Sequence, residues 1–381
     1  MEIINDKSYL LAEIQRLRQG EPPSRPSLIF VNRAQEMRVL LDDAERVMKT
    51  KTGVARVIIG DAGMGKSTLI YMLKELLFER KERVAFSYVE LRGMADVRPS
   101  ELGAKLYAAI LENLEDKEGL SGRELLTHVA SRIIDRLAGF RDRLVLRLVG
   151  RVTRRLRERV AQLGGYRHAL YALLLLAFDD LNPIAYDYLL GLRGLEPVES
   201  HAIVGRLGER IPWKLEEEKF SESLLAVVRA LDLAGYELTV IAIDELEMLY
   251  SWRRDWVDRF LPKLTALLSV RLESGSPCYF LLTTTPAFWE SDESKSIRVR
   301  YPFLYQRLRT TAIGPLSALT REDAEHLASR LTNMYRRVYG DAALMGVDER
   351  ALAMRAYSAG GGAPRELVTH IIDELEARVL R

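Results

Sequence analysis

The stretch that decides the fold is Val54-Ala55-Arg56-Val57-Ile58-Ile59-Gly60-Asp61-Ala62-Gly63-Met64-Gly65-Lys66-Ser67. Its first six residues are a short apolar run, which predicts a buried β-strand. Its last eight residues match the pattern Gly-x-x-x-x-Gly-Lys-Ser/Thr, and a helical periodicity follows over residues 66–81. A strand, a glycine-rich loop and a helix in this order predict a phosphate-binding loop in an α/β protein.

The loop predicts the contacts to the phosphates. Glycines allow the backbone N–H groups of residues 60–65 to turn toward phosphate oxygens, and the helix N-terminus adds partial positive charge. We expect Lys66 to reach the β- and γ-phosphates, Ser67 to hold Mg²⁺ and Thr68 to assist at the α-phosphate. The predicted contacts are Gly60, Asp61, Ala62, Gly63, Met64, Gly65, Lys66, Ser67 and Thr68.

The rest of the chain predicts a P-loop core with two helical additions. Apolar runs near 83–91, 238–243, 279–284 and 310–313 indicate strands that alternate with helical patterns. This alternation is typical of a parallel sheet with crossover helices. The expected divisions are an N-terminal helix and linker (1–25), two core segments (26–98 and 236–316), a helical insert (99–235) and a C-terminal helical lid (317–381).

Two carboxylates follow the strand predicted over 238–243. Asp244 and Glu245 stand at its carboxyl end, where ligand crevices open in parallel α/β sheets. We expect Asp244 to coordinate Mg²⁺, directly or through water, and Glu245 to act as general base toward the attacking water. Glu247 is expected on a helix surface. A base at position 245 distinguishes a hydrolase from a nucleotide-binding switch.

Three further side chains are candidates for completing the reaction. Threonines 283–285 end a predicted strand, and we select Thr284 to contact the γ-phosphate or the attacking water. Arg307, with Arg309 as the alternative, is placed to reach the γ-phosphate of a neighbouring subunit as an arginine finger, which predicts a homo-oligomer. Arg365 opens the last helix after a glycine-rich turn and is expected to contact phosphate from the lid.

In this order the motifs resemble the AAA+ and STAND P-loop ATPases, in particular their origin-recognition and Cdc6-like branch. Residues 29–36 resemble the opening nucleotide-binding box of that branch, where Gly often stands at the place of Asn32. The chain looks most like the ATP-binding proteins of BREX-type phage-defence systems, which share a long helical insert and a segment like Leu233-Ala234-Gly235-Tyr236. The resemblance implies ATP as the nucleotide, Arg33 as a nucleotide contact, and partner proteins of a defence or replication system.

Residues 136–159 form a strongly basic segment. Nine arginines oppose two acids, so the segment carries +7 and the rest of the chain −5. Apolar residues recur every fourth position from Phe140 to Val160, which predicts one amphipathic helix packed on its apolar side. Its arginines predict contacts to a DNA or RNA backbone; an anionic membrane and an ion-paired surface are the alternatives. The arginines selected for nucleic acid are Arg143, Arg147, Arg151, Arg154 and Arg155.

The composition sets the broad class. The 381 residues are 48% hydrophobic and 29% charged, which excludes a disordered chain. The single Cys278 excludes an intrachain disulfide and a cysteine zinc cluster. No run reaches the roughly 18 apolar residues of a membrane helix, and the first residues lack a secretory pattern. We therefore expect a cytoplasmic protein without membrane contact.

Three functions remain open from the sequence. The first is an oligomeric Mg-dependent ATPase that acts on DNA or on a nucleic-acid-bound partner in genome defence or maintenance. The second is an assembly switch of the STAND or initiator type, in which ATP binding rather than turnover sets the state. The third is a protein-binding scaffold with ATP as a structural ligand. ATP turnover, retention of nucleotide and the activity of ATP-site variants distinguish these functions.

Overall fold

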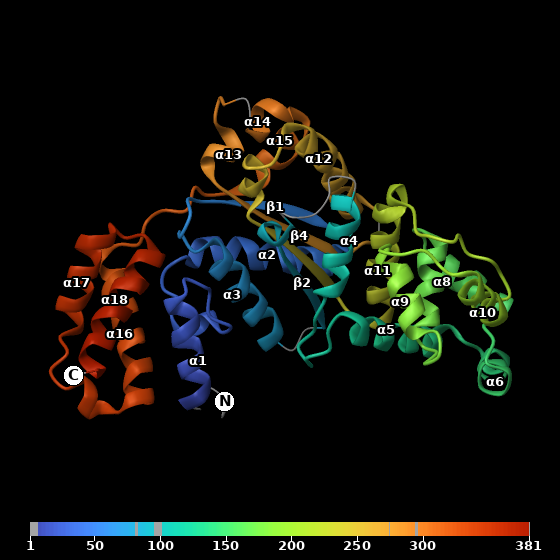
Figure 1. Cartoon of the computed structure of the whole chain (residues 1–381), viewed down its shortest axis with the longest axis horizontal. Helices are drawn as coiled ribbons and strands as arrows, with labels where there is room; N and C mark the ends of the chain where they lie inside the picture. Colours follow the sequence, from blue (N-terminus) through green and yellow to red (C-terminus); the bar gives the residue numbers. More distant parts are fainter. Residues whose placement is uncertain (1–6, 81–82, 95–100, 274, 294–295, 381) are drawn as a thin grey trace.

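A five-stranded, all-parallel sheet lies at the centre of the computed structural model, which describes residues 7–80, 83–94, 101–273, 275–293 and 296–380 (Figure 1). The strand order is β2-β3-β4-β1-β5. Glu90 pairs with Asp244 and Ile59 with Thr284, so the carboxyl ends of four strands align. The predicted α/β P-loop core is confirmed. The strands are β1 (Val54–Ile59), β2 (Val84–Glu90), β3 (Leu238–Asp244), β4 (Cys278–Thr284) and β5 (Ala312–Ile313).

Helices cover both faces of this sheet. Val240 and Leu281 pack on one face against the helices α2 (Ala34–Thr50) and α3 (Lys66–Glu79). Ile241 and Phe280 point to the other face and join a cluster with α4 (Leu102–Glu112), α11 (Phe220–Ala234) and α12 (Arg254–Ser269). Because alternate side chains are buried on opposite faces, the central strands are continuous apolar runs in the sequence.

The helical insert packs onto the sheet through the same apolar cluster. Leu106 of α4 and Leu174 share that cluster with Ile241 of the sheet, and the rings of Tyr107 and Phe220 stack at 4.6 Å. The insert extends away from the sheet in Figure 1. Its other helices are α5 (Gly122–Leu137), α6 (Phe140–Val149), α7 (Arg154–Ala161), α8 (Arg167–Leu175), α9 (Asn182–Leu190) and α10 (Pro197–Leu207).

The C-terminal helices form a separate apolar cluster together with the first helix. Leu10 and Ile14 of α1 (Lys7–Arg18) pack against Leu331 and Ile371. The lid helices are α16 (Arg321–Tyr339), α17 (Glu349–Gly360) and α18 (Pro364–Val379), and the short helices before β5 are α13 (Pro286–Glu290), α14 (Ile297–Arg300) and α15 (Pro302–Leu308). The boundaries of the five expected divisions stay a prediction. Within the described ranges, no helix is long and apolar enough to span a membrane.

The single basic helix expected over 136–159 is wrong. The chain there forms the end of α5, then α6 and α7, with breaks at 138–139 and 150–153. Gly150 ends α6 with a left-handed φ of 64°, and the Thr153 hydroxyl caps α7 by accepting from the Leu156 N–H at 3.1 Å. A repeat of apolar residues every fourth position therefore continues across two helix ends.

The expectation that this repeat packs as one stripe is also wrong. Leu156 and Val160 of α7 are buried, whereas Phe140, Leu144 and Leu148 of α6 are exposed. α6 is held instead by polar contacts at its start: the buried Asp142 carboxylate accepts from the Gly139 N–H and from the Thr153 hydroxyl.

Candidate functional site

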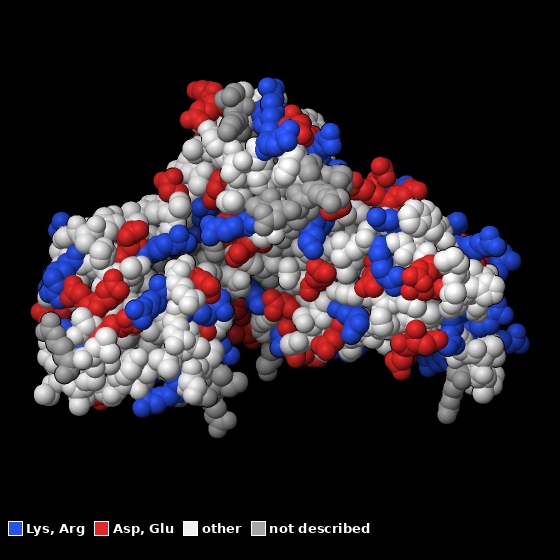
Figure 2. All heavy atoms as spheres, in the orientation of Figure 1, with Lys and Arg blue, Asp and Glu red and all other residues white. Residues whose placement is uncertain are grey.

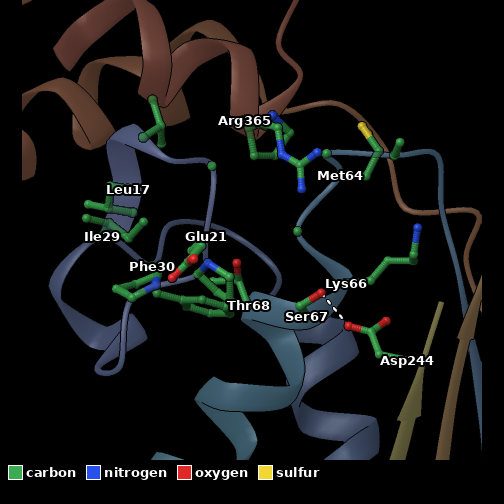
Figure 3. A pocket seen from close by; sticks show the side chains of 18 of the residues that line it. Leu17, Glu21, Ile29, Phe30, Met64, Lys66, Ser67, Thr68, Asp244 and Arg365 are labelled. Atoms are coloured by element: carbon green, nitrogen blue, oxygen red, sulfur yellow. Dashed lines mark hydrogen bonds between the residues drawn. The ribbon is translucent and has the colours of Figure 1, made fainter. Parts of the chain in front are cut away.

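A cavity of about 290 Å³ lies between the phosphate loop, the carboxyl ends of the strands, the lid and the N-terminal segment (Figure 3). Residues 62–68 of the loop line it, together with Asp244, Glu245 and Arg365. The position at the carboxyl edge is where ligands bind in open parallel sheets. The fold therefore brings the predicted phosphate loop and the predicted acidic pair to one cavity.

The loop has the backbone geometry that phosphate binding requires. Gly63 and Gly65 have φ values of 79° and 85°, the left-handed region that glycine adopts without a steric penalty. The Lys66 ammonium is buried and donates to the Gly60 and Asp61 carbonyl oxygens at 2.8 and 3.2 Å. The loop's own carbonyl oxygens therefore hold this cation at its base.

Glu247 also holds this lysine, contrary to its expected place on a helix surface. Its carboxylate lies 3.5 Å from the Lys66 ammonium and lines the cavity. Burial raises the pKa of Glu247, while Lys66 acts in the opposite direction. The residue follows β3 in the turn Leu246–Tyr250, which bends back toward the loop. The sequence pattern Asp-Glu-Leu-Glu shows that Glu247 stands three residues after Asp244, but it does not show that the chain turns back toward the loop.

Asp244 is fully buried at the end of β3 and accepts hydrogen bonds from three hydroxyls. The Ser67 Oγ donates to its Oδ2 at 2.6 Å, which Figure 3 shows as a dashed line. Tyr88 donates to the same oxygen and Thr283 to the other. Ser67 and Asp244, the two predicted magnesium ligands, are thus in direct contact. The sequence analysis did not identify Tyr88, although β2 places it beside β3.

Glu245 lies at the mouth of the cavity in a left-handed conformation with φ 63°. Its N–H donates to Asp244 Oδ1 at 2.9 Å and to the Thr283 hydroxyl at 3.0 Å. Its Oε1 is ion-paired with the Arg92 guanidinium at 2.7 Å, whereas its Oε2 is buried and has no hydrogen-bond partner in the part of the chain that the structure describes. Burial raises the pKa of Glu245 above its ordinary value, and Arg92 acts in the opposite direction.

Arg92 was not identified from the sequence. It lies just after β2, in the turn Leu91–Met94, at the same sheet edge as Glu245, and it lines the cavity. The carboxyl ends of parallel strands meet at one edge of a sheet. The position of Arg92 directly after a predicted strand therefore indicated that it lies near Glu245. Arg92 is therefore the cation that pairs with the predicted base.

Arg33 and Arg365 connect the lid to the loop. Arg33 is buried, and its guanidinium donates to the carbonyl oxygens of Ser317 and Met64. The Arg365 backbone N–H donates to the Gly63 carbonyl at 3.2 Å, and its guanidinium points toward the cavity (Figure 3). Asn32, where glycine is frequent in the resembling branch, has a left-handed φ of 61°.

Thr284 and Arg307 are not brought to this cavity. The Thr284 side chain is buried, and its hydroxyl has no hydrogen-bond partner among the described residues. Thr285, by contrast, lines the cavity. Arg307 is exposed on α15 and stacks over the Phe303 ring at 5.3 Å. An arginine that acts on a neighbouring subunit must be exposed, as Arg307 is. Thr284 as sensor and Arg307 as arginine finger both stay predictions.

The N-terminal segment, which was expected to be only a helix and a linker, forms a wall of the cavity. Leu17, Gly20, Glu21, Pro22 and Pro23 line it beside Ile29 and Phe30. Figure 3 shows Leu17, Glu21, Ile29 and Phe30 on the side of the cavity next to the lid helices. No short motif marks these residues. Their role depends on the packing of α1 against the lid, which brings distant parts of the chain together.

Comparison with protein-family models matches residues 11–379 to the family described as BREX system ATP-binding protein BrxC/D. The chain belongs to this family. A search of curated proteins found no significant match. Membership makes the chain an ATP-binding protein of a BREX phage-defence system, which implies that it works with other components of that system. The resemblance inferred from the motifs is confirmed.

Proposed function

We propose that this BREX protein hydrolyses ATP in a Mg²⁺-dependent reaction. The observation that carries the proposal is the arrangement of Ser67, Asp244 and Glu245 at one end of the nucleotide cavity. A switch that only binds ATP needs the phosphate loop, but it has no need for a carboxylate at the mouth beside the magnesium ligands. The Oε2 of Glu245, which has no hydrogen-bond partner among the described residues, is the oxygen that would accept a proton from water.

The residues present fit a magnesium ion. The Ser67 hydroxyl and the Asp244 carboxylate are hard oxygen ligands, and they converge within 2.6 Å of each other. Ser67 and Asp244 would hold the ion, directly or through water. When bound with ATP, Mg²⁺ neutralises charge on the β- and γ-phosphate oxygens.

The other residues orient the substrate and move the proton. Lys66 exchanges its carbonyl and Glu247 contacts for the β- and γ-phosphates, and Arg365 contacts phosphate from the lid. The Glu245 carboxylate takes the proton of the attacking water after it leaves Arg92. Thr284 stays the proposed sensor of the γ-phosphate, because its buried hydroxyl has no hydrogen-bond partner among the described residues.

A matched pair of variants tests the hydrolysis. We expect Glu245→Gln to lower the steady-state rate of ATP turnover by about 10²- to 10⁴-fold, because the amide cannot accept the proton. ATP affinity should remain near the native value, since the loop and Asp244 are untouched. Glu79→Gln, an exposed change at the end of α3, is the control. Native turnover in Glu245→Gln would rule out the proposed base.

An assembly switch is the second candidate, and two ion pairs favour it. Lys66 pairs with Glu247 and Glu245 pairs with Arg92, so the proposed phosphate contact and the proposed base are each held by another side chain of the protein. In that function the protein retains ATP, hydrolyses it very slowly and changes its assembly state, and so the mass of the assembly, when nucleotide binds. Rapid multiple turnover by the isolated chain contradicts this candidate.

The proposed action of Arg307 requires a homo-oligomer. If Arg307 reaches the γ-phosphate of a neighbouring subunit, Arg307→Ala and Glu245→Gln chains are each inactive alone. Mixing them restores part of the turnover, because some interfaces then combine an intact Arg307 with an intact Glu245. Arg309→Ala serves as the matched comparison for the alternative finger. Absence of restored turnover in a verified mixed assembly argues against a finger at 307.

Contact with a nucleic-acid backbone stays a proposal for the arginines of the insert. Arg151 and Arg155 are exposed and form no ion pair with another described residue, whereas Arg154 pairs with Glu158, and Arg143 donates to carbonyl oxygens of α5 and the turn after it. The Arg147 side chain lies outside the described part of the chain. Replacing Arg151 or Arg155 by Ala should lower the salt dependence of DNA binding by about one charge each.

A further inference from the structure

The first helix of the insert's basic segment carries an apolar ridge that no described residue covers. Phe140, Leu144 and Leu148 of α6 are 84%, 47% and 72% exposed. Their spacing of four residues places them along one side of the helix, over about 12 Å of its length. Scattered apolar residues are normal on a surface, but three large side chains in a row on one helix mark an interaction surface.

The ridge is not needed to hold α6 in place. The opposite side of the helix carries Asp142, which is buried and bonded to Gly139 and Thr153, and Leu146, which packs against the core of the insert. The Arg143 guanidinium donates to the Ala138 and Asp135 carbonyl oxygens at 3.2 and 2.8 Å. The helix is therefore fixed by its caps and inner side, and its outer side stays free for a partner.

Arginines flank the ridge. At 100° per residue, Arg141 lies beside the Phe140–Leu148 line, whereas the Arg143 guanidinium turns back to the carbonyl oxygens of Asp135 and Ala138. Arg151 follows the helix and is exposed. Figure 2 shows basic side chains and uncharged surface together at the end of the insert, over the region that Figure 1 labels α6 and α10. A ridge of this kind matches an apolar groove that has acidic residues along its rim.

We propose that α6 is the docking helix of this protein: its Phe140-Leu144-Leu148 ridge inserts into an apolar, acid-rimmed groove of another protein component of the same BREX system. The proposal is independent of the ATPase chemistry, because the ridge lies on the insert and none of its residues lines the nucleotide cavity. It uses the helix-in-groove mode, in which side chains one turn apart are the anchors and flanking charges select the partner.

Charge and polarity around the ridge favour a protein groove over the other surfaces. A nucleic-acid backbone is matched by the arginines but leaves three apolar side chains in water. An anionic bilayer is flat, so it contacts a wider area of the insert than the ridge alone, and the insert exposes acids near the end of α6 and on α7. Asp180 and Glu158 are each more than half exposed. Asp180 is ion-paired with the Arg206 guanidinium, which also donates to the Gly150 carbonyl at the end of α6. A groove takes only the ridge and leaves these acids in water.

The test measures binding of the full-length chain to each purified protein component of its BREX system, one at a time, by titration calorimetry. A triple variant, Phe140→Ser/Leu144→Ser/Leu148→Ser, removes the ridge. Val198→Ser removes an equally exposed apolar side chain from α10 and is the matched control. We expect one component to bind the native chain and the control alike, and the dissociation constant for the triple variant to rise at least about tenfold.

Two further measurements keep the result decisive. Arg141→Glu, a single exposed change, should weaken the same complex through repulsion from the acidic rim, even if the triple variant does not fold. Turnover of ATP by the variants without a partner should equal that of the native chain, which separates this test from that of the proposed hydrolysis.

The proposal is overturned if every component binds the native chain, the triple variant and Arg141→Glu equally, or if none binds. It is also overturned if the ridge variants lose only binding to a DNA duplex, to vesicles of equal parts phosphatidylglycerol and phosphatidylcholine, or to a second copy of the chain.

Discussion

At the scale of single residues, the Glu245 carboxyl is under two opposing influences, and this makes its protonation testable. Burial raises its pKa, and the Arg92 guanidinium at 2.7 Å opposes that rise. The proposed general base must be deprotonated, so ATP turnover should fall as pH drops through the pKa of Glu245 in the folded chain. Replacing Arg92 by Ala removes the favourable charge and raises that pKa further. The acid limb of the pH–rate profile should therefore move to higher pH.

The profile of kcat/KM against pH, measured for the native chain, Arg92→Ala and Arg92→Lys, checks this prediction. Below the limb, activity falls about tenfold for each pH unit, so Arg92→Ala should lose most at acid pH and recover at alkaline pH. Arg92→Lys keeps a cation near Glu245 and should hold the limb close to the native position. A limb that moves to lower pH in Arg92→Ala contradicts the assignment of Glu245 as base.

At the scale of elements, local spacing determined what the sequence predicted well. The strand over 54–59, the loop and α3 follow one another without interruption, so the phosphate site could be read from neighbouring residues. Asp244 and Glu245 were placed at the cavity because a strand end fixes both. Arg92 directly follows the predicted strand over 83–91, so its place at the same sheet edge could also have been predicted. The N-terminal wall depends on contacts between elements far apart in the chain, and the sequence alone does not state those contacts.

The basic segment shows why a periodic pattern fails at helix ends. Apolar residues continue at a spacing of four through Leu148, Val152 and Leu156, but Gly150 favours a left-handed turn and Thr153 a helix cap. Helix ends are fixed by backbone conformation and capping hydrogen bonds, which an apolar repeat does not report. The predicted single apolar side is therefore divided between two helices: the apolar side of α7 is buried, and that of α6 is the exposed ridge.

The junction between α6 and α7 gives a prediction at this scale. Asp142 accepts from Gly139 and Thr153, so Asp142→Ala leaves two donors unpaired and loosens α6. If the free energy of opening this segment falls by about 1–3 kcal/mol, backbone amides over 139–153 should exchange about 5- to 150-fold faster. Hydrogen exchange by mass spectrometry measures it, with Asp135→Ala, an exposed change at the end of α5, as the control. Unchanged protection over 139–153 would show that packing of Leu146 alone holds the helix.

At the scale of the whole molecule, the candidate nucleotide cavity is assembled from the two ends of the chain and its core. The core supplies the loop and the acids, the lid supplies Arg365, and the N-terminal segment supplies the wall that begins at Leu17. The wall is held by two kinds of contact. α1 packs into the apolar cluster of the lid, and the buried Glu13 carboxylate accepts from the Ser24 N–H at 2.8 Å, which fixes the proline-rich turn between them.

This assembly predicts that a change distant from the phosphates weakens ATP binding. Leu10 is fully buried between α1 and the lid, so Leu10→Ala costs about 2–5 kcal/mol of packing energy and partly undocks α1. Undocking withdraws Leu17 and Glu21 from the cavity, so the dissociation constant of ATP, measured by calorimetry, should rise at least about tenfold. Leu11→Ala removes the partly exposed neighbour and should leave ATP affinity unchanged. If Leu10→Ala lowers thermal stability but retains native ATP affinity, the N-terminal wall is a structural support for the lid and no part of the nucleotide site.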